Sequence, residues 1–335
     1  MKIKTNILND SFGRHHNYLR ISLIEKCNLR CAYCMPEEGV LLSPKKSLMT
    51  AEEVLSIAKV FVKHGVDKIR LTGGEPLLRK DFSTILEGLS QLNVALSITT
   101  NAVLVDRHIE DFKKYRLHHI NVSLDTLIEE KFTTITKRNQ FQKVKDNLQL
   151  LLGQGFKTKI NVVLMKGFND TEVIDFIKLT KDENLEVRFI EFMPFDGNKW
   201  SKDKLVSHQE ILDQVNRYFG EEANQVLVNE QNFTARNYKI RGFKGRYGII
   251  STVTNPFCDG CNRIRLTANG KLKNCLFSNN ETDLLSYLRK GESIEPLIAK
   301  SIYAKKAIRA GMTDTEDFEN PEKHNDNRSM ITIGG

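Results

Sequence analysis

The sequence predicts an α/β protein in which six strand–helix units form a parallel sheet or partial barrel, followed by a smaller C-terminal module. Short β-branched segments alternate with amphipathic helical segments up to about residue 194, and this alternation requires a parallel sheet with its helices outside. Beyond Pro194 the pattern changes to hairpins. We therefore expect a core over residues 1–194, starting near residue 17, and a module over residues 195–335.

Six segments have the composition of strands, and several end in glycine or a polar residue. They are RISLIEK (20–26), DKIRLTGG (67–74), VALSITTN (94–101), INVSLD (120–125), KINVVLM (159–165) and EVRFIE (186–191). The carboxyl ends of parallel strands form one rim, so residues at these ends are expected to share a site.

Helical spacing of apolar residues between these strands predicts the connecting helices. Thr50 and Glu53 have the form of a capping box, which predicts a helix over residues 50–64. Further helices are expected over residues 81–92, 141–152 and 172–180.

The C-terminal module begins with a charged linker and a helix ending near Tyr218. Two hairpins are predicted over residues 238–253 and 263–275, the second turning at Asn269 and Gly270. Residues 314–328 are charged and rich in asparagine, so we expect mobile parts there.

Composition restricts the partners and the compartment. Lys and Arg number 50 against 42 Asp and Glu, which gives a formal charge of +8 and favours an anionic partner, either nucleic acid or a phosphorylated small molecule. The N-terminus has no apolar signal region, and no apolar run nears the ~20 residues that span a bilayer. We expect a cytoplasmic protein without membrane contact, whose clustered thiols are metal ligands.

The six cysteines fall into two triplets, one formed by Cys27, Cys31 and Cys34 and the other by Cys258, Cys261 and Cys275. A structural zinc site needs four ligands, and no histidine lies close in sequence to complete either triplet. Three thiolates on a four-iron cluster would leave one iron open. The count favours two iron–sulfur clusters, with zinc or structural thiols as the alternatives.

Five cations lie within the predicted strands: Arg20, Lys68, Arg70, Lys159 and Arg188. A cation in an apolar strand is costly unless it is paired. Together these five favour a polyvalent anion such as a triphosphate, although any one of them could form a salt bridge or lie at a solvated strand end.

The CxxxCxxC motif after the first strand, GGEP after the second and the βα series resemble the radical S-adenosylmethionine (SAM) superfamily. This resemblance implies a partial (βα)6 barrel of the TIM type and a 4Fe-4S cluster whose open iron binds SAM. Longer segments resemble the GTP 3′,8-cyclase family of molybdenum cofactor biosynthesis nearly end to end. They are DSFGR, LRISL, CAYCMPEEGV, IRLTGGEPLLRKDF, INVSLDTL, KINVVLMKGFND, VRFIEFMP and FCDGCNRIRLTANGKLKNCLF, with the terminal Gly334 and Gly335. Small departures from that family, such as Ala102 where glycine is usual, touch no ligand.

The family resemblance implies a role for each site residue. Two 4Fe-4S clusters would be bound by the two cysteine triplets, the second in the C-terminal module with the guanine of GTP at its open iron. SAM would contact Tyr33, Gly74 beside Gly73, Glu75, Ser123 and Met193. GTP would contact Arg20, Lys68, Arg70, Thr99, Lys159, Arg188, Arg263 and Arg265. The flexible tail with Gly334 and Gly335 would enter the active site.

The implied reaction is radical cyclisation of GTP. The reduced N-terminal cluster would cleave SAM, and the resulting 5′-deoxyadenosyl radical would take the 3′ hydrogen of GTP, whose carbon radical adds to C8. The resemblance also implies an electron donor, a downstream cyclic pyranopterin monophosphate synthase that receives the product, and a monomer or homodimer without nucleic acid. The alternatives are a peptide-modifying radical SAM enzyme with an auxiliary cluster, and a zinc-ribbon protein that binds nucleic acid.

Overall fold

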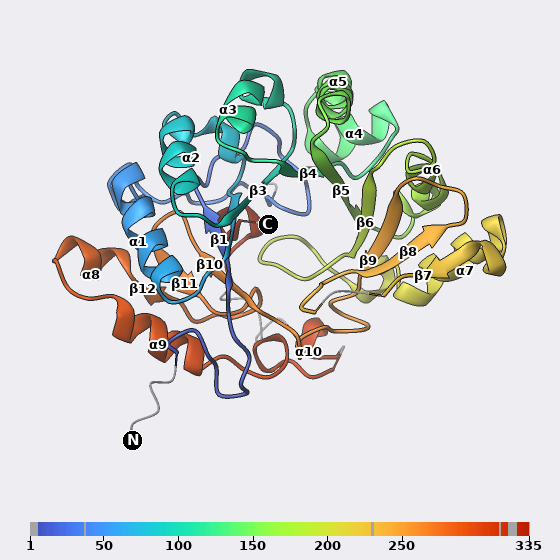
Figure 1. Cartoon of the computed structure of the whole chain (residues 1–335). Coiled ribbons are helices and arrows are strands. Elements are labelled where there is room, and N and C mark those ends of the chain that lie inside the picture. The colour runs from blue at the N-terminus through green and yellow to red at the C-terminus, as the bar shows by residue number, and fades with distance from the viewer. Residues whose placement is uncertain (1–5, 37, 229–230, 315, 321–326, 335) are drawn as a thin grey trace.

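A computed structural model of the chain describes residues 6–36, 38–228, 231–314, 316–320 and 327–334. Its strands form one sheet in the order β12-β11-β10-β1-β2-β3-β4-β5-β6-β9-β8-β7, which curves into an open barrel (Figure 1). The six central strands are parallel and follow chain order, as the sequence predicts. They are β1 Tyr18–Ser22, β2 Lys68–Thr72, β3 Ala95–Thr100, β4 His119–Ser123, β5 Lys157–Leu164 and β6 Glu186–Glu191.

The helices that connect these strands cover the outer side of the sheet (Figure 1). They are α1 Ala51–Lys63, α2 Phe82–Ser90, α3 Ile109–Lys114, α4 Glu129–Thr136, α5 Phe141–Gly153 and α6 Val173–Lys178. The predicted capping box is present at α1, where the Thr50 side chain accepts from the Glu53 amide and the Glu53 carboxylate accepts from the Thr50 amide.

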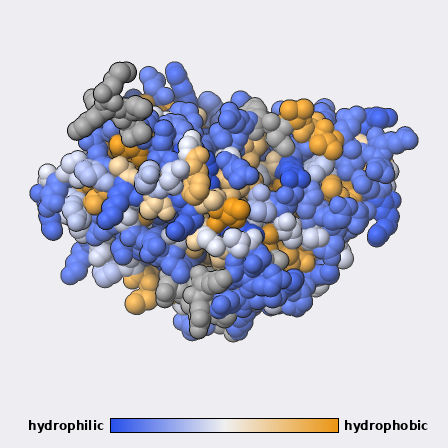
Figure 2. Space-filling view, turned by 90° about the horizontal axis from the view of Figure 1, so that it is seen from below, coloured by the Kyte–Doolittle hydropathy of each residue, from blue (hydrophilic) through white to orange (hydrophobic). Residues whose placement is uncertain are grey.

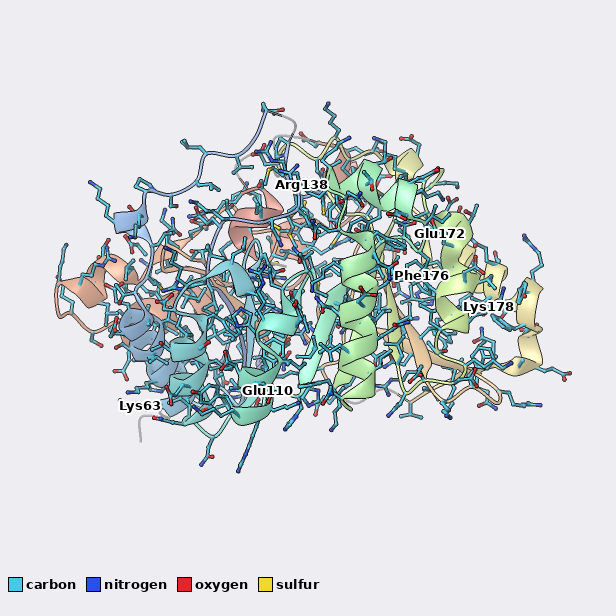
Figure 3. The ribbon with its side chains drawn as sticks, turned by 90° about the horizontal axis from the view of Figure 1, so that it is seen from above. Lys63, Glu110, Arg138, Glu172, Phe176 and Lys178 are labelled. Atoms are coloured by element: carbon cyan, nitrogen blue, oxygen red, sulfur yellow. The ribbon has the colours of Figure 1, made fainter. Side chains whose placement is uncertain are left out.

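Each helix turns an apolar face to the sheet and a charged face outward. Phe176 of α6 packs edge to face on Phe189 of β6, with ring centroids 6.4 Å apart. Lys178 of the same helix, like Lys63 of α1 and Glu110 of α3, is exposed, and all three lie at the outer rim in Figure 3. The apolar core therefore lies between the helices and the outer side of the sheet. Side chains on the inner side of the sheet are not needed for this core and can form a site.

The first strand differs from its predicted range, since it starts at Tyr18 and ends at Ser22. The Leu23 amide still donates to the Thr72 carbonyl at 2.9 Å, and the chain then leaves the sheet. Residues 24–26 instead pack on the glycines that follow β2, where the Gly74 amide donates to the Ile24 carbonyl at 2.7 Å. Apolar alternation alone could not distinguish this docked loop from a continuing strand.

The two predicted hairpins extend the same sheet at its two sides. Strand β10 (Arg263–Leu266) pairs in parallel with β1, and β9 (Arg246–Ile250) pairs in parallel with β6. Their antiparallel partners are β11 Lys271–Lys273 and β8 Arg236–Ile240, and the outermost strands are β12 Thr282–Asp283 and β7 Asn224–Val226. The C-terminal module thus covers the edges that β1 and β6 would otherwise leave unpaired.

The remaining helices are α7 His208–Phe219, α8 Leu285–Arg289, α9 Glu295–Tyr303, α10 Glu316–Glu319 and α11 Met330–Ile333. Short 3-10 turns occur at Lys45–Ser47, Pro76–Leu78, Val105–Arg107, Asp170–Glu172, Lys202–Lys204, Glu221–Ala223 and Arg309–Gly311. Of the segment predicted to have mobile parts, residues 315 and 321–326 lie outside the described residues, whereas Phe318 and Asn327 are buried.

The outer surface is mainly hydrophilic on the face shown in Figure 2, with smaller hydrophobic patches between the polar residues. Among the described residues, no helix is both long enough and apolar enough to span a lipid bilayer.

Candidate functional site

A cavity of about 300 Å³ lies inside the curve of the sheet, and both cysteine triplets line it. Most of the other predicted site residues line it too: Arg20, Tyr33, Arg70, Gly73, Gly74, Thr99, Ser123, Arg188, Met193, Arg263 and Arg265. The two triplets are separated by more than 200 residues of sequence, yet the parallel pairing of β10 with β1 brings them to one cavity.

The N-terminal triplet lies on a compact loop after β1. The Cys34 amide donates to the Cys31 carbonyl at 2.9 Å, and the Cys27 sulfur accepts from the Leu29 amide at 3.4 Å and from Asn101 Nδ2 at 3.6 Å. Burial raises the pKa of Cys27 to about 11 and raises the pKa values of Cys31 and Cys34 as well. These thiols would ionise only beside added positive charge, which bound metal supplies.

The C-terminal triplet has a different electrostatic environment. The Cys261 amide donates to the Cys258 carbonyl at 3.0 Å, and Lys305 Nζ donates to the Cys261 sulfur at 3.3 Å. Burial alone would raise the pKa of Cys261, but the positive charges of Arg263 and Lys305 outweigh it and lower the pKa to about 6. This thiol is therefore prepared for ionisation by side chains of the protein itself.

The glycines after β2 allow two backbone segments to meet. A Cβ at Gly73 would lie 2.6 Å from the Ile24 carbonyl oxygen, and a Cβ at Gly74 would collide with the Lys26 carbonyl oxygen. The Glu75 amide donates to that same Lys26 carbonyl at 2.8 Å. The close approach places the loop that carries Cys27 directly beside the end of β2.

Glu75 lies behind the cavity wall and does not line the cavity. Its carboxylate is fully buried and accepts from Thr100 Oγ1 and from the Asn101 amide, each at 2.8 Å. Burial raises the pKa of Glu75 to about 7. In this conformation Glu75 joins the ends of β2 and β3, so its predicted contact with SAM stays a prediction.

Tyr33 connects the cysteine loop to β4. Its hydroxyl donates to Asp125 Oδ2 at 2.7 Å, and Asp125 Oδ1 accepts from the Val163 amide at 2.9 Å. Burial raises the pKa of Asp125 to about 6. Tyr33 therefore has a fixed orientation at the cavity wall.

The arginines that line the cavity are almost free of acidic partners. Within the described residues, Arg20 Nε, Arg188 Nε and Arg263 Nη2 are buried without any hydrogen bond, and Arg70 donates to Ser97 Oγ at 3.2 Å. In the described part of the chain no carboxylate lies within ion-pair distance of four of them, Arg20, Arg70, Arg263 and Arg265, while Arg188 lies 3.9 Å from Glu186. Several cations with few carboxylate partners, of which Arg70, Arg188 and Arg265 are buried, make this end of the cavity a site for a polyvalent anion.

Two of the predicted GTP contacts do not line the cavity. Lys159 Nζ is paired with the Glu186 carboxylate at 2.8 Å, and Arg246 binds the same carboxylate at 2.6 Å. The Lys68 ammonium lies 4.9 Å from the centre of the Tyr18 ring. For Lys159 the structure thus shows a salt bridge, which was the alternative to a GTP contact.

Tyr18 does not line the cavity, but it supports the cations there and was not predicted from the sequence. Its ring lies under the cationic groups of Arg20, Lys68 and Arg70, at 5.4, 4.9 and 5.5 Å from its centre. Its hydroxyl is buried and has no hydrogen-bond partner in the part of the chain that the structure describes. Burial would raise the pKa of Tyr18, but Arg70 and the neighbouring cations outweigh it and lower the pKa to about 7. The predicted first strand starts at Arg20, so Tyr18 lay outside it, although in the structure Tyr18 and Arg20 share one face of β1.

Lys305 and Arg309 line the cavity and were not predicted from the sequence, because they follow α9 in a segment without any motif. The tail reaches the same region, where Arg265 Nη1 donates to the Gly334 carbonyl at 2.5 Å. Gly334 has a φ of +84°, and a Cβ there would crowd Thr72 Oγ1 and the Ser22 side chain. Gly335 lies outside the described residues.

Comparison with known proteins identifies two family regions. Residues 21–180 match the Radical SAM superfamily, and residues 185–310 match the family described as Molybdenum Cofactor Synthesis C. The SAM-bound structure of Streptococcus suis SuiB is similar in fold, with a TM-score of 0.61 at 16% identity over 94% of this chain and 77% of that one.

Curated relatives match along nearly the whole chain. Molybdenum cofactor biosynthesis protein 1 of Bos taurus is 48% identical over 97% of this chain, and the chain spans about half of that relative's length, 51%. The GTP 3′,8-cyclase of Listeria monocytogenes is 41% identical over 88% of this chain and 90% of its own, and the mitochondrial GTP 3′,8-cyclase of Arabidopsis thaliana is 43% identical over 99% and 84%. The chain therefore belongs to the GTP 3′,8-cyclase family of the radical SAM superfamily.

Proposed function

We propose that the protein is a GTP 3′,8-cyclase that converts GTP to (8S)-3′,8-cyclo-7,8-dihydroguanosine 5′-triphosphate, the first step of molybdenum cofactor biosynthesis. The observation that carries this proposal is one cavity lined by two cysteine triplets and by buried arginines with few acidic partners. Family membership supports the same reaction.

The N-terminal triplet suits a 4Fe-4S cluster that binds SAM. Its three thiols are partly buried and line the cavity, and their raised pKa values require a positively charged group for thiolate formation. When bound, this cluster and SAM supply a radical that takes a hydrogen atom from the substrate. Beside them, the backbone of Gly74 and the side chains of Tyr33 and Ser123 would orient SAM.

The C-terminal triplet suits a second 4Fe-4S cluster. Among the described residues, no three His, Cys, Asp or Glu side chains are close enough to hold a single metal ion, as a mononuclear zinc site requires. A four-iron cluster is a larger group, and three cysteine ligands would leave one of its irons for the guanine of GTP.

The chain's own residues would bind and orient GTP between the two triplets. Arg20, Arg70 and Arg188 would bind the triphosphate, and Arg263 and Arg265 would lie nearer the guanine, beside Cys261. Enclosure by the curved sheet would hold the reacting atoms in place and exclude water.

The partners follow from this reaction. We propose that a separate electron donor reduces the protein, that a cyclic pyranopterin monophosphate synthase receives the product, and that the protein works in the cytoplasm as a monomer or homodimer. A reducing compartment keeps cysteine thiols available as iron ligands.

Anaerobic reconstitution followed by incubation with SAM, dithionite and GTP tests the function. We expect roughly eight irons per chain, as two four-iron clusters require, and a cyclised triphosphate detected by mass spectrometry. Cys31→Ala should abolish formation of 5′-deoxyadenosine, whereas Cys261→Ala should stop cyclisation and leave some uncoupled SAM cleavage. Roughly four irons in the unaltered chain would contradict the second cluster, and a fully loaded protein without cyclised product would contradict the reaction.

A further inference from the structure

The segment before β1 forms a hook over residues 9–17 that reaches the C-terminal triplet. The hook is closed by an isolated bridge between Asn9 and His15. Inside it, the Asp10 carboxylate binds Arg14 Nε at 2.6 Å and His16 Nε2 at 3.0 Å. Three polar side chains are thus fixed to one another next to the sheet.

Arg14 connects this hook to two distant segments. Its Nη1 donates to the Cys258 carbonyl and to the Ala307 carbonyl, each at 2.8 Å, and its Nη2 donates to the Lys306 carbonyl at 2.9 Å. The loop that carries Cys258 and the segment after α9 are therefore held side by side.

Lys305 is the charged group at the centre of this arrangement. It is buried, and its Nζ donates to the Arg263 carbonyl at 2.9 Å and to the Cys261 sulfur at 3.3 Å. His16 Nδ1 lies 3.5 Å from the same ammonium. Because His16 Nε2 faces Asp10, a proton on Nε2 leaves Nδ1 free to accept from Lys305.

Lys305 has no carboxylate within ion-pair distance in the described parts of the chain. A buried ammonium is costly unless an anion lies beside it, and the only candidate anion among its hydrogen-bond partners is the sulfur of Cys261. A thiolate at Cys261 and the Lys305 ammonium would therefore stabilise each other.

We propose that Lys305 is a positioning residue for the second cluster: its ammonium donates a hydrogen bond to the Cys261 ligand sulfur, and the hook holds it there through His16. The proposal rests on the proposed second cluster. Cationic hydrogen-bond donors on a ligand sulfur stabilise the reduced form of a cluster, so Lys305 raises the midpoint potential of this cluster. The N-terminal triplet has carboxylates nearby, Glu75 for Cys27 and Asp125 for Cys31, and the two clusters therefore differ in potential.

The test measures the potential of the second cluster by itself. In a full-length chain carrying Cys27→Ala, Cys31→Ala and Cys34→Ala, only the C-terminal triplet remains to bind iron. We expect an anaerobic potentiometric titration, followed by electron paramagnetic resonance, to show a lower midpoint potential in Lys305→Met and an unchanged one in Lys305→Arg. Lys306→Met is the matched control, since the Lys306 side chain is exposed and only its carbonyl contacts Arg14.

The outcomes separate this proposal from the proposed function. Iron analysis of the chain that lacks Cys27, Cys31 and Cys34 tests the second cluster itself, and absence of bound iron would overturn both proposals. A normally loaded Lys305→Met variant with an unchanged midpoint potential would overturn only the role of Lys305. If Lys305→Met does not bind iron, His16→Leu is measured instead, because it keeps the ammonium and removes the imidazole that holds it. We then expect a smaller downward shift of the midpoint potential, and an unchanged potential would count against the proposal.

Discussion

Arg188 and Lys159 lie on neighbouring strands of the barrel, yet the structure gives them different partners. Arg188 lines the cavity, and the Glu186 carboxylate lies 3.9 Å from its Nε, which makes no hydrogen bond to any described residue. Lys159 is outside the lining and pairs with the same Glu186 at 2.8 Å. The two cations are therefore expected to differ in their importance for substrate binding.

Replacing Arg188 by alanine should weaken GTP binding more than replacing Lys159. Loss of a buried charge-assisted contact to phosphate costs roughly 1.5–3 kcal/mol, which is about ten- to a hundredfold in affinity. Lys159→Ala should have a smaller effect on GTP and should lower thermal stability, because Glu186 loses one of its cations. Calorimetric titration of GTP into both loaded variants checks this, and equal loss of affinity would contradict the distinction.

Tyr18 should titrate far from the ordinary range of a phenol. The pKa of Tyr18 is lowered to about 7, against about 10 in an unfolded chain. A lowered pKa means that the folded state favours the phenolate. The stabilisation that the Tyr18 phenolate adds to the free energy of unfolding is therefore complete above pH ~10 and is lost as the pH falls through about 7. Stability should thus rise over this window relative to Tyr18→Phe.

Ultraviolet titration of the metal-free protein measures this ionisation directly. We expect a tyrosinate band near pH 7 that is absent in Tyr18→Phe, and we expect GTP to move it to higher pH, because the triphosphate neutralises the cations around the ring. A band that appears only near pH 10 in the unaltered protein would contradict the assigned environment.

At the scale of elements, the glycine turn after β2 determines where the N-terminal cysteine loop lies. A Cβ at Gly74 would collide with the Lys26 carbonyl oxygen, and backbone cannot move aside as a flexible side chain can. Gly74→Ala should therefore displace residues 24–26 together with Cys27, and the N-terminal triplet should lose its iron.

Gly153 offers the matched control for Gly74. It is the last residue of α5, is exposed, and has open space where a Cβ would be placed. Gly153→Ala should keep full iron content and should stabilise the protein by roughly 0.5–1 kcal/mol. Iron analysis and thermal unfolding of both variants check the pair, and normal iron content in Gly74→Ala would show that the turn tolerates a side chain.

Local patterns predicted the elements better than their partners. The strands β2 to β6 and the capping box of α1 follow from alternation and from cap chemistry, which act over a few residues. The pairing of β10 with β1 and the contact of Lys305 with Cys261 depend on residues far apart in sequence, and no local period encodes them. The same limit explains why Lys159 was expected in the cavity, since its partner Glu186 is set by strand register.

At the scale of the whole molecule, the chain returns at its C-terminus to the barrel where it began. Ile333 of α11 belongs to a second apolar cluster with Phe195, Phe277 and Phe318, apart from the main core. Ser329 Oγ donates to the Cys34 carbonyl at 3.4 Å, and Figure 1 shows α11 in red within the curve of the sheet. The tail therefore contacts the loop of the first triplet and, through Arg265, the strand β10 that lies between Cys261 and Cys275 of the second.

Removing Gly334 and Gly335 should disable the reaction while sparing the fold. Arg265 would lose the Gly334 carbonyl that it now binds, and its guanidinium would no longer be fixed toward the substrate. A misplaced charge-assisted contact costs roughly 1.5–3 kcal/mol, so cyclised product should form about ten- to a hundredfold more slowly. Gly334→Ala should act in the same direction, because its φ of +84° and the crowding by Thr72 both disfavour a side chain.

The readouts for this prediction separate the tail from the clusters. Thermal unfolding and iron content should match the unaltered protein, because neither triplet is changed. GTP affinity should also be kept, because Arg20, Arg70 and Arg188 would still bind the triphosphate, so the misplacement of Arg265 should appear in the rate of cyclisation. An added peptide ending in two glycines should restore part of the product, since small residues can enter the space beside Ser22 and Thr72. A truncated protein that cyclises GTP at the normal rate would show that the contact between Gly334 and Arg265 is not needed for the reaction.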